Sequence, residues 1–229
     1  MTATRPEAAS AAAPDTPFST RLRERTRQGH AGAEHSGYMS ALTSGELPLE
    51  GYAALAAQQH AVYAVLEEAG DAMRADPVAG LFVADELRRL GALEADLAFL
   101  LGPGWRALSA PTAATRAYCA RLREVCFDWP AGFVAHHYTR YLGDLSGGQI
   151  LGTLVARTYG LDEDGVRFYR FEQIPKPKSF KDRYRALLDA APWDGQEQER
   201  VIEEVLVAYD HNTRMLASLD DVARALLRR

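Results

Sequence analysis

Glycines and histidines are the residues of this chain whose types and positions suggest chemistry. Three glycines, Gly143, Gly147 and Gly148, interrupt an otherwise helical pattern that reads YLGDLSGGQILG at residues 141–152. Each glycine inside a helix costs about 1 kcal/mol relative to alanine, so three of them need compensation. Glycine offers two things in return, because it lets a flat body contact the backbone and it lets the helix bend.

Histidine is the residue type to examine for a metal ligand, because the chain has neither dense cysteine nor clustered carboxylates. The six histidines are His30, His35, His60, His136, His137 and His211. A histidine taken alone is more often a surface or hydrogen-bonded core residue than a ligand. His30 has more support, because Glu34 follows one helical turn later and can orient the imidazole.

Arginines precede His30 at positions 23, 25 and 27, by whole or near-whole turns of the same predicted helix. A metal-binding histidine beside cationic side chains suits a metal that is held in a cofactor with carboxylate groups. Heme is such a cofactor. A solvated basic helix that contains a histidine is the alternative, and it would be preferred if this segment stood alone.

A resemblance to a known family links the two regions. The segment YTRYLGDLSGGQ resembles the distal-helix signature of the heme oxygenases, and RTRQGHAGAE resembles their proximal-histidine segment. The similarity continues in the family order through AVYAVLEEA, DELRRLGALEADLAFLLGP, SFKDRYRALLD and ERVIEEVLVAYDHN, and it covers nearly everything from Phe18 to Leu219. It implies an all-α fold, with heme held between a proximal helix and a kinked, glycine-rich distal helix.

The resemblance also implies roles for individual residues. His30 would be the iron ligand, and Glu34 would orient it. The positions that match contacts to the heme propionates are Arg23, Arg27, Tyr138, Lys181 and Arg185. The animal enzymes usually carry lysine at the first two of these positions, so the seating of heme can differ here, although arginine pairs with carboxylates through two bonds. Tyr209 and Asn212 match positions on a late helix near the pocket wall.

On the distal side, the resemblance places Gly143 and Gly147 near the bound oxygen and the porphyrin, and Gly148 at the bend. Asp144 would anchor a distal water network, of which Arg140 and Tyr63 would be further members. Each of these three has a structural alternative. Asp144 could be a local cap at the helix break, Tyr63 an ordinary core aromatic, and Arg140 a buried residue bonded to carboxylates or carbonyls. His136 and His137 are expected to be bystanders, because the match carries no second iron ligand.

The elements that must position these residues are helices, since strand-like alternation is nearly absent from residue 18 onward. Helices are predicted at 18–42, 47–73, 84–102, 111–127, 131–159, 180–190 and 197–227. The first should have Ser19 or Thr20 near its cap and end near Gly37. The segment 167–180 is the least regular, and its aromatic alternation allows a short strand. We expect a disordered tail at 1–17 and one helical domain at 18–229.

Composition narrows the class of protein. The chain has 229 residues, 47% of them hydrophobic, and a net charge of -5, which argues against a general nucleic-acid binder. The start lacks the continuous apolar run of a signal peptide, and the basic end VARALLRR is too short to be a membrane anchor. Cys119 and Cys126 form neither a disulfide framework nor a CxxC metal motif, as expected for a cytoplasmic protein. We expect a monomer.

The reaction that the resemblance implies is oxidative opening of heme to biliverdin, ferrous iron and carbon monoxide. Heme is then both substrate and cofactor. O2 and external electrons are required, and a ferredoxin with its reductase or a flavoprotein would supply the electrons. One alternative is a heme carrier or sensor, which would not need the distal residues Asp144, Arg140 and Tyr63. Another is an unrelated helical hydrolase or thiaminase-like enzyme, for which neither cysteine has an obvious base partner.

Overall fold

The computed structural model describes residues 16–33 and 37–228, and the side chains of all of these except 28–33. Every regular element in these residues is a helix, so the predicted all-α fold class is confirmed. Most of the predicted tail, through residue 15, lies outside the described residues, and the boundaries predicted for the domain stay a prediction.

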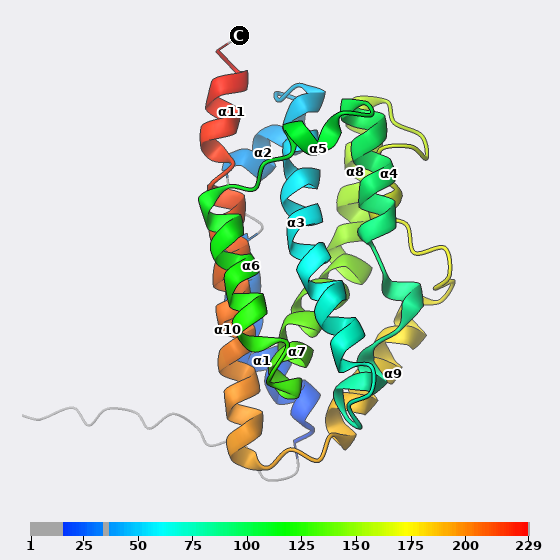
Figure 1. Cartoon of the computed structure of the whole chain (residues 1–229), viewed down its shortest axis with the longest axis vertical. Coiled ribbons are helices and arrows are strands. Elements are labelled where there is room, and N and C mark those ends of the chain that lie inside the picture. Colours follow the sequence, from blue (N-terminus) through cyan, green and yellow to red (C-terminus); the bar gives the residue numbers. More distant parts are fainter. Residues whose placement is uncertain (1–15, 34–36, 229) are drawn as a thin grey trace, which may run out of the picture.

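The helices follow one another along the whole described chain (Figure 1). The α-helices are α1 (Phe18–Ala33), α2 (Gly37–Ser44), α3 (Leu49–Met73), α4 (Leu90–Leu101), α5 (Trp105–Leu108), α6 (Ala113–Val125), α7 (Pro130–His137), α8 (Gln149–Tyr159), α9 (Pro177–Ala190), α10 (Gly195–Ala217) and α11 (Asp220–Leu226). Short 3₁₀ turns occur at Ala79–Phe82, Asp85–Leu87 and Arg167–Tyr169. Two π-helical segments, Tyr138–Leu142 and Asp144–Gly148, lie between α7 and α8.

Helix α3 is the central element of the core. It packs against α4, α6 and α7, and Figure 1 shows it between the pair α6 and α10 and the pair α4 and α8. Leu55, Val62 and Leu66 on this helix are almost fully buried. A helix that is apolar around most of its circumference belongs inside a protein. The central position of α3 lets its few polar side chains reach buried sites.

The interruption predicted in the glycine-rich stretch is present. Residues 130–159 follow one continuous helical path from α7 to α8, but the two π-helical segments on either side of Gly143 replace the α-helical hydrogen bonds. π-helical turns are rare and often occur at functional sites. The path ends at Gly160, whose φ of 64° is the left-handed conformation that closes many helices. We call residues 138–148 the distal segment.

Several predicted helix boundaries are wrong. The predicted first helix covers α1 and α2, and the residues between these two elements lie outside the described ones. The predicted last helix divides at Ser218 and Leu219 into α10 and α11. Helix α1 begins at Phe18, so Ser19 and Thr20, which were expected near its cap, lie in its first turn. The backbone N–H and the hydroxyl of Ser19 donate to Asp189 of α9, at 2.7 and 3.0 Å.

The strand allowed at 167–180 is also wrong, because this segment forms a 3₁₀ turn and the start of α9. The carboxylate of Asp96 accepts the backbone N–H groups of Arg167 and Phe168 at 2.9 and 2.8 Å. Those donors therefore bond to a buried side chain and have no need of a neighbouring strand.

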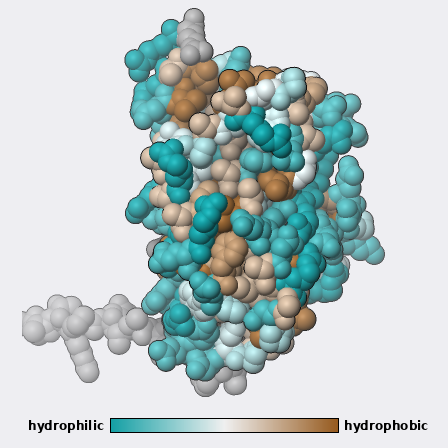
Figure 2. Space-filling view, viewed as in Figure 1, coloured by the Kyte–Doolittle hydropathy of each residue, from teal (hydrophilic) through white to brown (hydrophobic). Residues whose placement is uncertain are grey.

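The surface in Figure 2 is mostly polar, with apolar side chains gathered in a few places. In the described part of the chain, no helix combines the length and the apolar character needed to cross a bilayer.

Candidate active site

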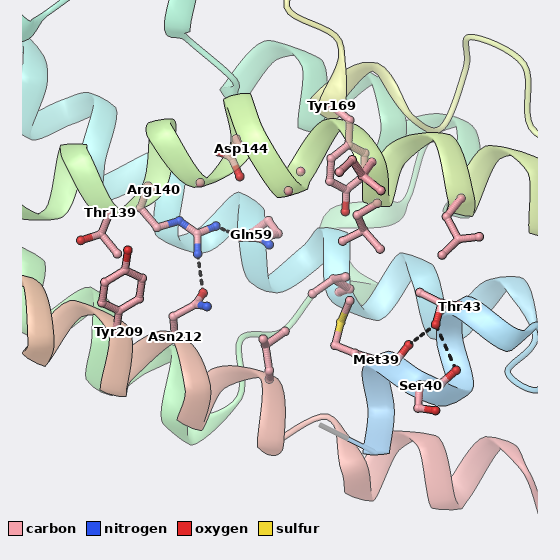
Figure 3. A pocket seen from close by; sticks show the side chains of 18 residues that line it. Met39, Ser40, Thr43, Gln59, Thr139, Arg140, Asp144, Tyr169, Tyr209 and Asn212 are labelled. Atoms are coloured by element: carbon pink, nitrogen blue, oxygen red, sulfur yellow. Dashed lines mark hydrogen bonds between the residues drawn. The ribbon is translucent and has the colours of Figure 1, made fainter. Parts of the chain in front are cut away.

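A cavity of about 680 Å³ opens along the distal segment (Figure 3). Its walls come from α2, α3, α8, α10 and the 3₁₀ turn at Arg167–Tyr169. The lining residues are Met39, Ser40, Thr43, Leu55, Gln59, Thr139, Arg140, Gly143, Asp144, Gly147, Gly148, Ile150, Leu151, Leu154, Tyr169, Tyr209, Asn212 and Leu216. Most of the surface is apolar, and the charged groups are Arg140 and Asp144. This combination of apolar walls and a few placed polar groups is typical of a site for a small molecule.

A second cavity, of about 400 Å³, adjoins the first, since Gly143 and Tyr209 line both. Its lining residues are Arg23, Thr26, Arg27, Tyr138, Leu142, Gly143, Ser146, Lys181, Arg185 and Tyr209. The five residues matched to propionate contacts all lie here, contributed by α1, the distal segment and α9. Four of them are cationic, and no carboxylate is among the described residues of the lining. We call this space the basic cavity and the first one the distal cavity.

Lys181 is connected to the distal segment. Its Nζ donates to the hydroxyl of Ser146 at 2.8 Å and to the carbonyl of Leu145 at 3.2 Å. Partial burial, and secondarily the nearby Arg185, lower the pKa of the Lys181 ammonium. Two neighbouring cations that repel one another favour an anionic ligand between them.

The glycines of the distal segment differ in the space beside them. A Cβ built at Gly143 would meet no atom of a described residue within 4 Å, and this backbone lines both cavities. A Cβ at Gly148 would lie 3.4 Å from Cβ and 3.5 Å from Oδ1 of Asp144. Gly143 therefore admits a body against the backbone, whereas a Cβ at Gly148 would make ordinary van der Waals contacts with Asp144. Gly147 lines the distal cavity between them.

Asp144 is a buried carboxylate bonded to a buried phenol. The hydroxyl of Tyr63 donates to its Oδ2, and Oδ1 bonds to no described residue. The carboxylate also accepts from no described backbone N–H, so the contacts favour a network member over a local cap. Burial raises the pKa of Asp144, and the charge of Arg140 and the hydrogen bond from Tyr63 only partly oppose this.

Tyr63 lies behind Asp144 and does not line either cavity. Its side chain is fully buried, with the rings of Tyr141 and Phe168 at centroid distances of 5.4 and 5.3 Å. Burial, and secondarily the charge of Asp144, raise the pKa of the phenol well above its ordinary value. The phenol therefore stays protonated at neutral pH, and it holds the carboxylate in place as a donor.

Arg140 is held by neutral oxygens. It donates to Oδ1 of Asn212 on α10 at 2.5 Å and to Oε1 of Gln59 on α3, as the dashed lines in Figure 3 show. Its Cζ lies 5.1 Å from the centre of the Tyr63 ring. Burial disfavours the charged guanidinium, but Tyr63 and Asp144 outweigh this and raise the pKa of Arg140. It therefore remains cationic.

The predicted iron ligand falls outside this description. The side chain of His30 and all of Glu34 lie outside the described residues, so both stay predictions. His136 bonds to Glu204 and His137 to the hydroxyl of Tyr184, each at 2.9 Å, and neither lines a cavity. Their expected role as bystanders stays a prediction. Among the described side chains, no group of histidine, cysteine, aspartate and glutamate could hold a metal ion.

Several cavity residues were not predicted. Gln59 had a signal, because it lies one turn before Tyr63 on the same face of α3. No sequence signal pointed to the three cavity residues of α2, because the prediction joined this helix to the preceding one. These residues are Met39, Ser40 and Thr43. Tyr169 lies in the irregular segment after α8.

Comparisons with known proteins agree with this geometry. The family model for heme oxygenase matches residues 16–218. Heme oxygenase 1 of Synechocystis sp. is 36% identical over 203 residues, which are 89% of this chain and 85% of that protein. Heme oxygenase 1 of Rattus norvegicus is 37% identical over 205 residues, which are 88% of this chain and 71% of that protein.

Solved structures give the same result. The crystal structure of heme oxygenase-1 from Synechocystis sp. in complex with heme superposes with a TM-score of 0.85 at 34% identity, over 93% of this chain and 95% of that one. Heme oxygenase from Leptospira interrogans gives a TM-score of 0.83 at 33% identity, over 88% of this chain and 99% of that one. The match covers the distal segment and both cavities, and the chain therefore belongs to the heme oxygenase family.

Proposed function

We propose that this chain binds heme in the two joined cavities and opens its porphyrin ring with O2 and external electrons, forming biliverdin, ferrous iron and carbon monoxide. The observation that carries the proposal is the buried group of Asp144, Tyr63 and Arg140 at the wall of a cavity large enough for a ligand. A heme carrier needs the cavity and the cations, but it has no use for a buried carboxylate with a raised pKa.

The residues present fit heme in three respects. The bare backbone at Gly143 accepts a flat ring, as the open space around it indicates. Leu151, Leu154 and Leu216 offer apolar walls to the macrocycle. The basic cavity offers Arg23, Arg27, Lys181, Arg185 and the phenol of Tyr138 to two propionates. His30, oriented by Glu34, would hold the iron, and Tyr209, which lines both cavities, would contact the ligand where they meet.

Heme, when bound, supplies both the iron at which O2 is activated and the ring carbon that is oxidised. Asp144 lines the cavity and its Oδ1 has no described partner, so this oxygen would hold a water molecule by accepting its hydrogen bond. A carboxyl with a raised pKa takes up and releases a proton more readily near neutral pH than an ordinary aspartate does. Asp144 would thus move protons through that water, while Tyr63 fixes its position.

Arg140 and Gly143 would control charge and space. The guanidinium stays charged and stabilises negative charge that develops in the cavity. Asn212 acts through it as an anchor. Gly143 and Gly147, which line the distal cavity, would let the backbone approach the ring closely enough to limit where the reacting oxygen can point, and Gly148 would lie at the bend.

The electron donor would dock at the open side of the basic cavity. Arg23, Arg27 and Lys178 are exposed, and Lys181 and Arg185 are partly exposed, on a chain whose net charge is -5. Such a local positive surface attracts an acidic partner, such as a ferredoxin or an acidic flavoprotein. We further propose that the protein is cytoplasmic and works as a monomer.

The proposed function is tested by adding hemin to the purified protein with a ferredoxin, its reductase and NADPH in air. The Soret band should give way to the spectrum of biliverdin while carbon monoxide is released. A Soret band that forms and then persists under reductant would instead indicate a heme carrier.

A further inference from the structure

Two neighbouring glutamines of α3 serve different parts of the molecule. The Oε1 of Gln58 accepts from the backbone N–H of Thr112 and the hydroxyl of Thr115, both at 2.8 Å, and so fastens the start of α6. Gln59 lines the distal cavity and accepts from Arg140. Successive residues of an α-helix project about 100° apart, so one glutamine meets α6 while the next faces the distal segment.

The orientation of the Gln59 amide follows from its partner. A guanidinium has only donors, so the amide must present Oε1 to Arg140. Its Nε2 then carries two N–H donors that bond to no described residue. Since the residue lines the cavity, these donors are available to what the cavity holds.

Gln59 is also one of two residues whose side-chain amide oxygens accept from the terminal nitrogens of Arg140, and the phenol of Tyr63 interacts with the same guanidinium. Asn212 holds one terminal nitrogen from α10, and Gln59 holds the other from α3 (Figure 3). The Nε of Arg140 is buried and has no described partner. A guanidinium is planar, so two anchors on opposite helices fix the plane in which its charge lies. Losing either would let it turn.

We propose that Gln59 is a positioning residue of the oxygen-activating site, which fixes the plane of Arg140 and donates an N–H to water in the distal cavity. The inference rests on the proposed function, since it names a further member of the same site. An apolar residue at this position would leave Arg140 with one anchor and remove a donor from the cavity.

The test measures the optical acid–alkaline transition of the ferric hemin complex in Gln59→Leu and Gln59→Ala. The alkaline form places one more negative charge in the cavity, and both the guanidinium and the amide N–H stabilise it. The pKa of this transition should therefore rise by about half a unit or more in both variants, roughly a threefold change in the equilibrium. Two variants of different size cover the case in which one fails to fold.

Gln58→Leu is the matched control, because it removes the same side chain one residue away. It should lower the thermal unfolding midpoint and leave the pKa of the acid–alkaline transition unchanged. The proposal is overturned if both Gln59 variants bind hemin and titrate within about 0.1 unit of the unmodified protein, or if Gln58→Leu shifts the transition as much. Failure of the unmodified protein to form biliverdin would instead contradict the proposed function, and the titration is read separately from it.

Discussion

Two buried carboxylates in this protein have opposite surroundings. Glu204 on α10 accepts from Arg121 at 3.0 and 2.5 Å and from His136 at 2.9 Å. Burial alone would raise its pKa, but these hydrogen bonds from His136 and Arg121 lower the pKa of Glu204 to about 2. Asp144 has one described hydrogen-bond partner, a phenol, and burial raises its pKa.

The difference separates a structural charge from a reactive one. A carboxylate whose oxygens are occupied by an arginine and a histidine stays ionised and joins helices, here α6, α7 and α10. A carboxylate with one unoccupied oxygen, a raised pKa and a cavity in front of it is suited to proton transfer. The predictions below test this division between Glu204 and Asp144.

The largest effect is expected from Asp144→Ala. Removing one preorganised polar group at a reacting oxygen commonly raises a barrier by about 3–4 kcal/mol, which is roughly a 10²- to 10³-fold loss of rate. Reductant-driven formation of biliverdin, measured at equal heme occupancy, should fall by that factor. Hemin binding should remain close to normal, because the matched propionate contacts lie in the basic cavity. A rate within threefold of the unmodified protein would remove Asp144 from the chemistry.

Glu204→Gln should affect stability instead of rate. Breaking a buried ion pair typically costs about 3 kcal/mol, and here it leaves the partly exposed Arg121 with only its ion pair to Glu124. The free energy of unfolding in urea should fall by that amount, while turnover per folded molecule stays unchanged. The exposed neighbour Glu203 provides the control, since Glu203→Gln should change neither quantity. A large loss of turnover in folded Glu204→Gln would break the comparison.

The two carboxylates should also respond to pH with opposite sign. The pKa of Glu204 is lower in the folded state, so its stabilising contribution is present above its usual value of 4.5 and is lost as the pH falls toward about 2. The pKa of Asp144 is raised, so its contribution is favourable in acid and is lost as the pH rises through the folded value. The free energy of unfolding in urea, measured from pH 3 to pH 7, would give both contributions.

Isosteric variants show the sign of each carboxylate's contribution to the pH dependence of stability. Relative to the unmodified protein, Glu204→Gln should lose its stability deficit as the pH falls, because the unmodified protein then protonates too. Asp144→Asn should become relatively more stable as the pH rises toward neutral. Parallel curves for the two variants would contradict the opposite pKa shifts.

The smallest effect concerns exposed charge, which salt screens far more than buried charge. At limiting ferredoxin, turnover should slow as salt rises, because the Debye length falls from about 10 Å at 0.1 M to about 3 Å at 1 M. At saturating donor the rate should change little. Lys178→Glu should raise the ferredoxin concentration needed for half-maximal turnover by a fewfold. A rate at limiting donor that does not change with salt would remove the support for this docking surface.

Local patterns in the sequence predicted the break at Gly143, Gly147 and Gly148 and the order of the main helices. They failed where long-range contacts decide the structure. Alternating aromatics at 167–180 allowed a strand, but Asp96 takes the two backbone donors from a distant helix. A continuous helical pattern hid the division between α10 and α11 at Ser218 and Leu219.

The same reasoning applies to the site. The matched positions at the two cavities do lie together, although their roles stay predictions and His30 lies outside the described side chains. Gln59 could have been noticed as a polar residue four before Tyr63. Its hydrogen bond with Arg140 could not have been predicted, because that bond depends on how α3, α10 and the distal segment pack.

The central claim is that Asp144 organises oxygen chemistry and does more than hold a broken helix together. The most direct test adds hydrogen peroxide to the ferric hemin complexes of the unmodified protein and of Asp144→Ala, and measures ring-opened product against oxidation of an added peroxidase substrate. The unmodified protein should direct peroxide to ring opening, whereas Asp144→Ala should form little ring-opened product and oxidise the added substrate. Equal yields of ring-opened product from the two proteins would contradict the claim.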